Sequence, residues 1–188
     1  MNIKKYKLLL ILAGIFLLGV LYIFIKINNT WKYSGFINKY ATQYNVDPML
    51  IKAIIKAESN FVSDAVSSKG AIGLMQIMPA TGKQIAQYLQ IKNFKAEMLY
   101  NPETNIMFGV CYYNILNTMF NGNSNLILAS YNAGLGNVTQ WRQTNPIVEY
   151  DSEQMPFNET KKYVKKIDKI YAMLKFTDKI KKLMFLWK

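Results

Sequence analysis

An uninterrupted apolar segment extends from Leu8 to Ile25 near the start of the chain. It carries no charged residue, and as a helix it would be about 27 Å long, close to the thickness of a bilayer's hydrocarbon core. The pattern predicts one transmembrane helix at residues 8–25. Residues 1–7 would precede this helix, and a polar linker at residues 26–35 would follow it.

Beyond residue 35, apolar positions recur mainly at intervals of three and four, which is typical of helices packed on a core. Asp47-Pro48 and Asn101-Pro102 each offer an N-cap followed by a proline in the first turn. Alternating patterns typical of strands are hard to find. We therefore expect a mainly α domain at residues 36–175, with a connector from Thr144 to Phe157. The expected helices occupy residues 36–44, 48–58, 79–89, 102–113, 125–131 and 163–174.

Lysines 4, 5 and 7 precede the apolar segment. By the positive-inside rule, they favour a cytoplasmic N-terminus and a domain outside the cytoplasm. A cleaved signal peptide is the alternative interpretation. The segment is longer than an ordinary signal-peptide core and no small-residue cleavage site follows it, which favours an uncleaved single-pass anchor in the cell membrane.

The composition excludes several kinds of chemistry. The chain has no histidine and one cysteine, Cys111, which we expect in the core. An intrachain disulfide, the histidine-based nucleophile systems and the commonest zinc ligand are therefore absent. After the three N-terminal lysines, 20 basic and 11 acidic residues remain. This excess favours a polyanionic partner outside the membrane, a cell wall or a lipid surface more than nucleic acid.

Glu58 occupies an apolar face at the expected end of the helix 48–58. The helix dipole and apolar surroundings both favour the protonated carboxyl, which could donate a proton to a leaving oxygen near neutral pH. A solvated glutamate at a helix end is the simpler alternative. The following loop combines small residues with Ser67 and Gln76, and this suits either close approach of a ligand or a plain glycine turn.

Four ordered blocks of residues resemble the soluble-type lytic transglycosylases (SLT domain) of the lysozyme-like superfamily. Together they cover about residues 36–174. The blocks are Glu58-Ser59 with Ser67, Gly70-Ala71, Gly73-Leu74-Met75-Gln76 and Met78-Pro79; Asn101-Pro102 with Asn105-Ile106, Gly109 and Tyr112; Tyr131-Asn132-Ala133-Gly134; and Glu159-Thr160 with Tyr163.

The resemblance implies a lysozyme-like catalytic domain that acts on bacterial peptidoglycan glycan strands. Glu58 would first protonate the oxygen between N-acetylmuramic acid and N-acetylglucosamine, then act as base, leaving a 1,6-anhydromuramyl end. No cofactor or metal is implied. The residues expected to bind substrate are Ser67, Gln76, Met78, Tyr112, Tyr131, Asn132, Glu159 and Tyr163. Taken singly, each tyrosine also fits a core position, and Asn132 fits either a turn cap or a substrate contact.

Ordinary glycosidases need a second carboxylate beside the bond, and none is evident in the sequence. Asp64 lies at a variable position of the resemblance, and Glu97 has no motif around it. Two alternatives stay open: a hydrolase related to goose-type lysozyme, which would activate water, and a non-catalytic protein that binds the wall or assists its assembly.

The last residues, 176–188, combine lysines with apolar side chains at helical spacing. A basic amphipathic helix favours an anionic lipid surface. A solvated charged face on the last helix of the domain explains the same pattern. Both interpretations remain open at this point.

Overall fold

The computed structural model describes residues 11–19, 32–144, 153 and 155–186. The chain divides into two compact units, Met1–Gly35 and Phe36–Lys188. Residues 11–19 are helical, and the remainder of the predicted transmembrane segment lies outside the described residues. Among the helices that the structure describes, none is both long enough and apolar enough to cross a membrane.

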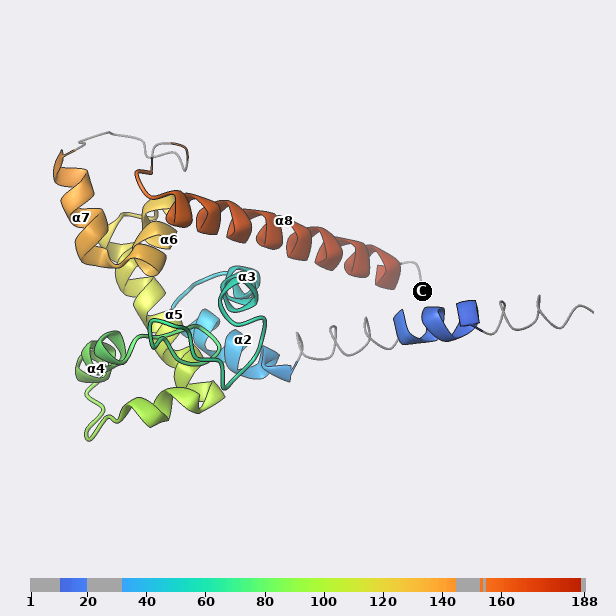
Figure 1. Ribbon diagram of the computed structural model, residues 1–188, viewed down its shortest axis with the longest axis horizontal. Coiled ribbons are helices and arrows are strands. Elements are labelled where there is room, and N and C mark those ends of the chain that lie inside the picture. Colours follow the sequence, from blue (N-terminus) through green and yellow to red (C-terminus); the bar gives the residue numbers. More distant parts are fainter. Residues whose placement is uncertain (1–10, 20–31, 145–152, 154, 187–188) are drawn as a thin grey trace, which may run out of the picture. The chain divides into compact units, whose positions relative to one another are not determined.

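The second unit is mainly helical, as predicted (Figure 1). Extended pairing in the described residues is limited to two isolated bridges, Val66 with Ile72 and Ile72 with Ile77. The helices are α2 (Ser34–Gln43), α3 (Pro48–Glu58), α4 (Pro79–Tyr88), the 3-10 helix η1 (Ala96–Tyr100), α5 (Pro102–Met119), α6 (Ser124–Ala133), α7 (Leu135–Thr144) and α8 (Asn158–Leu186).

Side-chain caps fix the starts of α3 and α5. The Asp47 carboxylate accepts a hydrogen bond from the Met49 amide at 2.8 Å, and the Asn101 side chain accepts one from Thr104 at 3.0 Å. A proline follows each cap, where its missing N–H costs no helical hydrogen bond. Both boundaries agree with those expected from the sequence.

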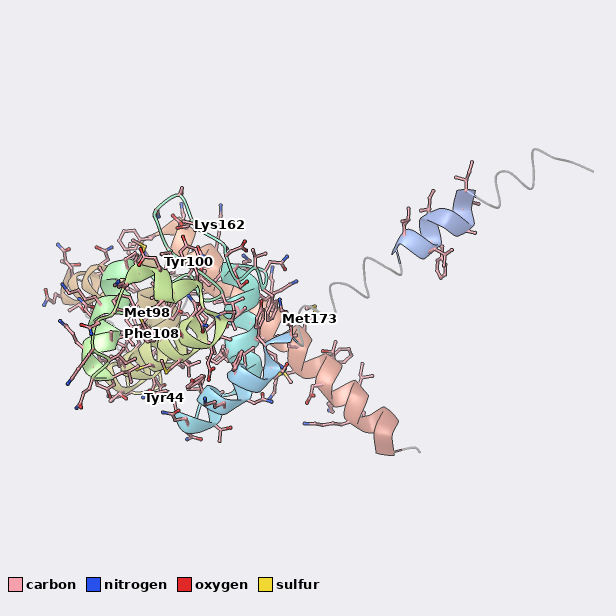
Figure 2. All side chains as sticks on the ribbon, turned by 90° about the horizontal axis from the view of Figure 1, so that it is seen from below. Tyr44, Met98, Tyr100, Phe108, Lys162 and Met173 are labelled. Atoms are coloured by element: carbon pink, nitrogen blue, oxygen red, sulfur yellow. The ribbon has the colours of Figure 1, made fainter. Side chains whose placement is uncertain are left out.

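Helix α5 runs through the core of the second unit. Phe108 and Cys111 of this helix are fully buried, as are Ile51, Ile54 and Ile55 of α3. Figure 2 shows Phe108 in the interior of the helical domain. The burial of Cys111 confirms its expected place in the core. Helix α8 packs along α3 and α6, and its first half, which buries Val164 and Ile167, helps to enclose the centre of the domain (Figure 1).

The helical pattern missed η1 and α7 and underestimated α8. Helix α7 buries only Val138 and Trp141, too few apolar positions to produce a recognisable period. Helix α8 begins at Asn158 and continues to Leu186 without a break. No glycine or proline interrupts this stretch, so the residues predicted as a basic amphipathic tail continue the same helix as far as Leu186.

Candidate active site

The segment between α3 and α4 folds back on the end of α3. The Ser59 hydroxyl, 8% exposed, donates a hydrogen bond to the Leu74 carbonyl at 2.8 Å. Within the segment, Ile72 and Ile77 exchange two backbone hydrogen bonds of 3.0 Å. The C-terminus of α3, and Glu58 with it, is thereby joined to the loop.

Asn105 of α5 attaches this loop to the core. Its amide nitrogen donates to the Ile72 and Leu99 carbonyls at 2.8 Å each, and its oxygen accepts from the Met75 amide at 2.7 Å. The side chain is buried and uses both ends of its amide. Gly73, at φ +81°, leaves the necessary space, because a Cβ there would lie 2.3 Å from the Asn105 nitrogen. The loop conformation therefore depends on both residues.

A pocket of about 560 Å³ opens beside the loop. It brings together Glu58 and seven of the eight residues expected to bind substrate. Its lining consists of Glu58, Ser67, Lys69, Ala71, Gln76, Ile77, Met78, Thr81, Tyr112, Tyr131, Asn132, Ala133, Gly134, Asn137, Phe157, Glu159 and Thr160. Tyr163 is the eighth expected residue. It is 8% exposed and contacts Glu58 directly.

Burial raises the pKa of Glu58 from 4.5 to about 7. Two neighbours act in the opposite direction and lower this pKa. The Tyr163 hydroxyl donates a hydrogen bond to Oε1 of Glu58 at 2.6 Å, and Lys166 supplies a nearby positive charge. Lys166 also donates to the Ala57 carbonyl at 2.7 Å. At neutral pH the carboxyl can therefore both donate and accept a proton.

The tyrosines fit both interpretations that the sequence left open, a position in the core and a place at the substrate pocket. Tyr131 lines the pocket, yet its hydroxyl donates to the Met75 carbonyl at 3.0 Å and supports the loop. The rings of Tyr112 and Tyr131 lie 5.4 Å apart. Burial raises the pKa of Tyr131 and of Tyr163 well above 10, so both hydroxyls remain neutral donors at ordinary pH.

Gln76 and Ser67 shape the loop as well as lining the pocket. Gln76 adopts φ +50°, and its amide nitrogen donates to the Ala65 and Gly73 carbonyls at 3.1 and 2.8 Å. The Ser67 hydroxyl accepts from the Ala71 amide at 2.9 Å. A substrate would therefore meet side chains that already hold the backbone in place.

Asn132 lies in the last turn of α6, and Gly134 follows as the C-cap. The side-chain oxygen of Asn132 accepts a hydrogen bond of 3.1 Å from the hydroxyl of Thr160, a residue at the start of α8 that is 4% exposed. This contact joins α6 to α8 at the pocket. A turn-capping role for Asn132 receives no support from these contacts.

Glu159 is the second carboxylate at the pocket, while Asp64 and Glu97 are not among the lining residues. Its side chain is exposed and lies 3.8 Å from Lys69.

The sequence provided no indication of a role for Lys69, Thr81, Asn137 or Phe157. These residues belong to no recognised block, and α7, which carries Asn137, had no clear helical period. In the described part of the chain, no group of acidic or cysteine side chains could hold a metal ion.

Comparison with known proteins agrees with this geometry. The family model of the transglycosylase SLT domain matches residues 35–153, more than half of the chain. The chain belongs to the SLT family. This SLT domain is 33% identical over 140 residues to the soluble lytic murein transglycosylase of Escherichia coli K12, covering 72% of this chain and 22% of the relative. It is 42% identical over 97 residues to the membrane-bound lytic murein transglycosylase E of Buchnera aphidicola, covering 49% and 46%.

A solved structure resembles the SLT domain with a TM-score of 0.70. It is an inactive mutant of the lytic transglycosylase Slt from Pseudomonas aeruginosa, 34% identical, and the match covers 77% of this chain and 24% of that one. The chain thus spans about a quarter of the length of the soluble relatives it matches.

Proposed function

We propose that the protein is a peptidoglycan lytic transglycosylase, which cleaves the bond between N-acetylmuramic acid and N-acetylglucosamine without water. The observation that carries this proposal is Glu58: a largely buried carboxyl, with a pKa raised by burial to about 7, at the wall of a glycan-sized pocket. A carboxyl whose pKa lies near neutral pH, at the wall of a pocket, has the properties that a general acid–base group needs.

The proposed reaction uses Glu58 twice. The protonated carboxyl donates its proton to the glycosidic oxygen, and that C–O bond breaks. The N-acetyl oxygen of the muramic acid residue stabilises the positive centre. The carboxylate then removes the proton from the 6-hydroxyl of the same residue, whose oxygen closes the 1,6-anhydro ring. Tyr163, bonded to Oε1, holds the carboxyl in place and stabilises its ionised form between the two steps.

The eight residues expected to bind substrate keep that role in the proposal. Tyrosine rings suit the faces of sugars, and amide and hydroxyl groups suit their polar substituents. The names of the relatives support the same reaction, since several are called lytic murein transglycosylases. The Pseudomonas structure is described as inactive after a glutamate-to-glutamine substitution, which supports one essential carboxyl in that enzyme.

A hydrolase is the second candidate, because the pocket contains Glu159 as well as Glu58. A base that activates water would have to be ionised and free to accept a proton. Glu159 is exposed, and the one contact described for its side chain is with Lys69 at 3.8 Å, so no described contact orients its carboxylate toward a water beside Glu58.

Product analysis separates these candidates. We expect wild-type protein to release muropeptides from purified peptidoglycan that are one water molecule lighter than hydrolysis products. Mass spectrometry of the soluble fraction measures the difference, with a lysozyme digest of the same wall as reference. Reducing muramic acid ends would reject the transglycosylase reaction and support hydrolysis. A lack of soluble products under conditions that preserve the fold would support a binding protein.

We also propose that the protein is anchored in the cell membrane by residues 8–25, with the SLT domain on the wall side. Support comes from the uncharged segment, the lysines before it and the names of the membrane-bound relatives. Protease added to intact spheroplasts tests this arrangement. Cleavage of the SLT domain is expected, and protection until the membrane is broken would refute it.

The distal part of α8 is proposed as a second contact with anionic lipid. From Met173 onward this helix extends beyond the other helices of the domain (Figure 2). It exposes Met173, Phe176, Ile180 and Leu183, which recur at intervals of three and four, with lysines around them. The alternative from the sequence, a solvated charged face, explains the lysines but leaves these apolar side chains uncovered.

Removal of residues 176–188 from a protein comprising residues 30–188 should weaken binding to vesicles of anionic lipid by about a hundredfold, because four lysines and one aspartate are lost and each lysine near the surface contributes about 1 kcal/mol. Sedimentation with vesicles of neutral and of anionic lipid measures this effect. Lys175, which contacts Asp47 at 3.1 Å, remains in the shortened protein. Equal binding by both proteins would eliminate the lipid contact.

A further inference from the structure

Lys69 is the one cationic side chain among the described residues that line the pocket. Neutral sugars need hydrogen-bonding and aromatic groups, which the tyrosine, asparagine and glutamine side chains already supply. A lysine adds a compact positive charge that favours an anionic group of the ligand. Its presence at the pocket therefore indicates a substrate with a negative charge close to the glycan chain.

The backbone around Lys69 is held in a closed turn. The Gly70 amide donates to the Ser67 carbonyl at 2.9 Å, and the Ser67 amide donates to the Ala71 carbonyl at 2.9 Å. The Ser67 hydroxyl accepts from the Ala71 amide as well. Gly70 provides the positive φ of +83° that the turn requires. The lysine thus projects from a fixed base, although its side chain is 78% exposed.

The ion pair between Lys69 and Glu159 is weak, so a ligand can replace Glu159 as the partner of the lysine. Glu159, in the first turn of α8, lies 3.8 Å from the lysine nitrogen, and 76% of its side chain is exposed. Exposed ion pairs contribute little net free energy, since water solvates both charges well. A carboxylate of a bound ligand can therefore replace Glu159 as the partner of Lys69 and leave Glu159 to accept hydrogen bonds from the ligand.

We propose that Lys69 is a specificity-determining residue that binds a free carboxylate of the peptide attached to the muramic acid residue. The inference rests on the proposed function, because it takes peptidoglycan as the ligand. It goes further by assigning the charged substituent of the glycan, and not only its sugar rings, to a particular side chain.

Wall binding by the full chain tests the proposal in a Glu58→Gln background, in which the wall stays intact. Two walls are compared: untreated peptidoglycan and peptidoglycan whose carboxylates are converted to neutral amides. We expect Lys69→Met to weaken binding to untreated wall about fivefold, as for loss of one partly exposed charged contact. Lys69→Arg should restore most of the affinity.

Binding to the neutralised wall tests whether Lys69 contacts a carboxylate. There, Lys69→Met should bind as well as its parent, because no carboxylate remains for the lysine to contact. The exposed Lys92, outside the pocket, provides the matched control as Lys92→Met.

The proposal is overturned by equal binding of Lys69→Met and its parent to untreated wall, by the same loss on neutralised wall, or by an equal loss in Lys92→Met. Failure of the proposed function has a different signature. In that case the protein with Glu58 intact makes no anhydro products, while the dependence of binding on Lys69 and on wall carboxylates is still observed.

Discussion

Replacement of Glu58 with glutamine is expected to lower the rate of glycan cleavage by about a thousandfold or more, the range lost when a general acid–base group is removed. Glutamine keeps the size and polarity of the side chain but cannot donate a proton to the glycosidic oxygen or accept one from the 6-hydroxyl. The release of anhydromuropeptides over time measures the effect. A variant that retains a tenth of the wild-type rate would remove Glu58 from the proposed reaction.

The stability of the same variant separates lost chemistry from lost structure. The pKa of Glu58 is 4.5 when exposed and is raised by burial to about 7 in the folded domain. The folded state therefore retains the proton at pH values where the unfolded state has lost it. Stability from this group is fully present below pH 4.5 and is lost as the pH rises to about 7.

Glutamine does not titrate, so Glu58→Gln should not lose this stability as the pH rises. We expect Glu58→Gln to be more stable than wild type at pH 8 by about 2–3 kcal/mol, and to differ much less at pH 4. Urea unfolding of both proteins at the two pH values measures this difference. A variant that is both inactive and less stable at pH 8 would show that the glutamine disturbs the fold, and the activity result would then carry no weight.

Replacement of Asn105 with alanine is expected to destabilise the domain by about 3–5 kcal/mol and to abolish cleavage. The substitution removes three hydrogen bonds at once and leaves the Met75 amide and the Leu99 carbonyl without their partner, each at a cost of about 1–3 kcal/mol, while the Ile72 carbonyl keeps its bond from the Ile77 amide. The loop would lose its attachment to α5, and with it the pocket wall formed by Gln76 and Ile77.

Asn114→Ala on the same helix provides the matched control, because Asn114 is only partly buried and lies outside the pocket. The control should change the free energy of unfolding by less than about 1 kcal/mol. Thermal unfolding followed by circular dichroism compares the two variants. If Asn105→Ala were no less stable than Asn114→Ala, the loop would not depend on the three hydrogen bonds.

The sequence predicted most of the helices because their signals are local. An N-cap followed by proline marks α3 and α5, and the apolar period within each helix marks its buried face. Helix α7 lacked both signals, since its neighbours in space, and not its own period, determine its burial. The start of α8 was predicted five residues too late, at residue 163, whereas the helical spacing predicted for the tail agrees with the continuation of α8 through residues 176–186.

The site was predicted as a set of residues but not as a structure. Ordered motifs indicated Glu58 and the groups around it, and the pocket brings nearly all of these together. Their contacts could not be predicted, because they join residues far apart in the chain. The Tyr163 hydroxyl bonds a carboxyl 105 positions earlier, and Asn105 bonds a loop about 30 positions away. The substrate-binding roles of these residues stay predictions.

Helix α8 forms hydrogen bonds with both ends of α3. Lys166 bonds the Ala57 carbonyl at the C-terminus of α3, while Tyr171 and Lys175 both contact the Asp47 carboxylate, which caps its N-terminus. A sliding or rotating movement of α3 would break contacts at both ends together. In the proposed reaction, the proton donor Glu58 is therefore preorganised before a glycan binds, and the binding energy of the substrate would remain available for distortion of the sugar ring.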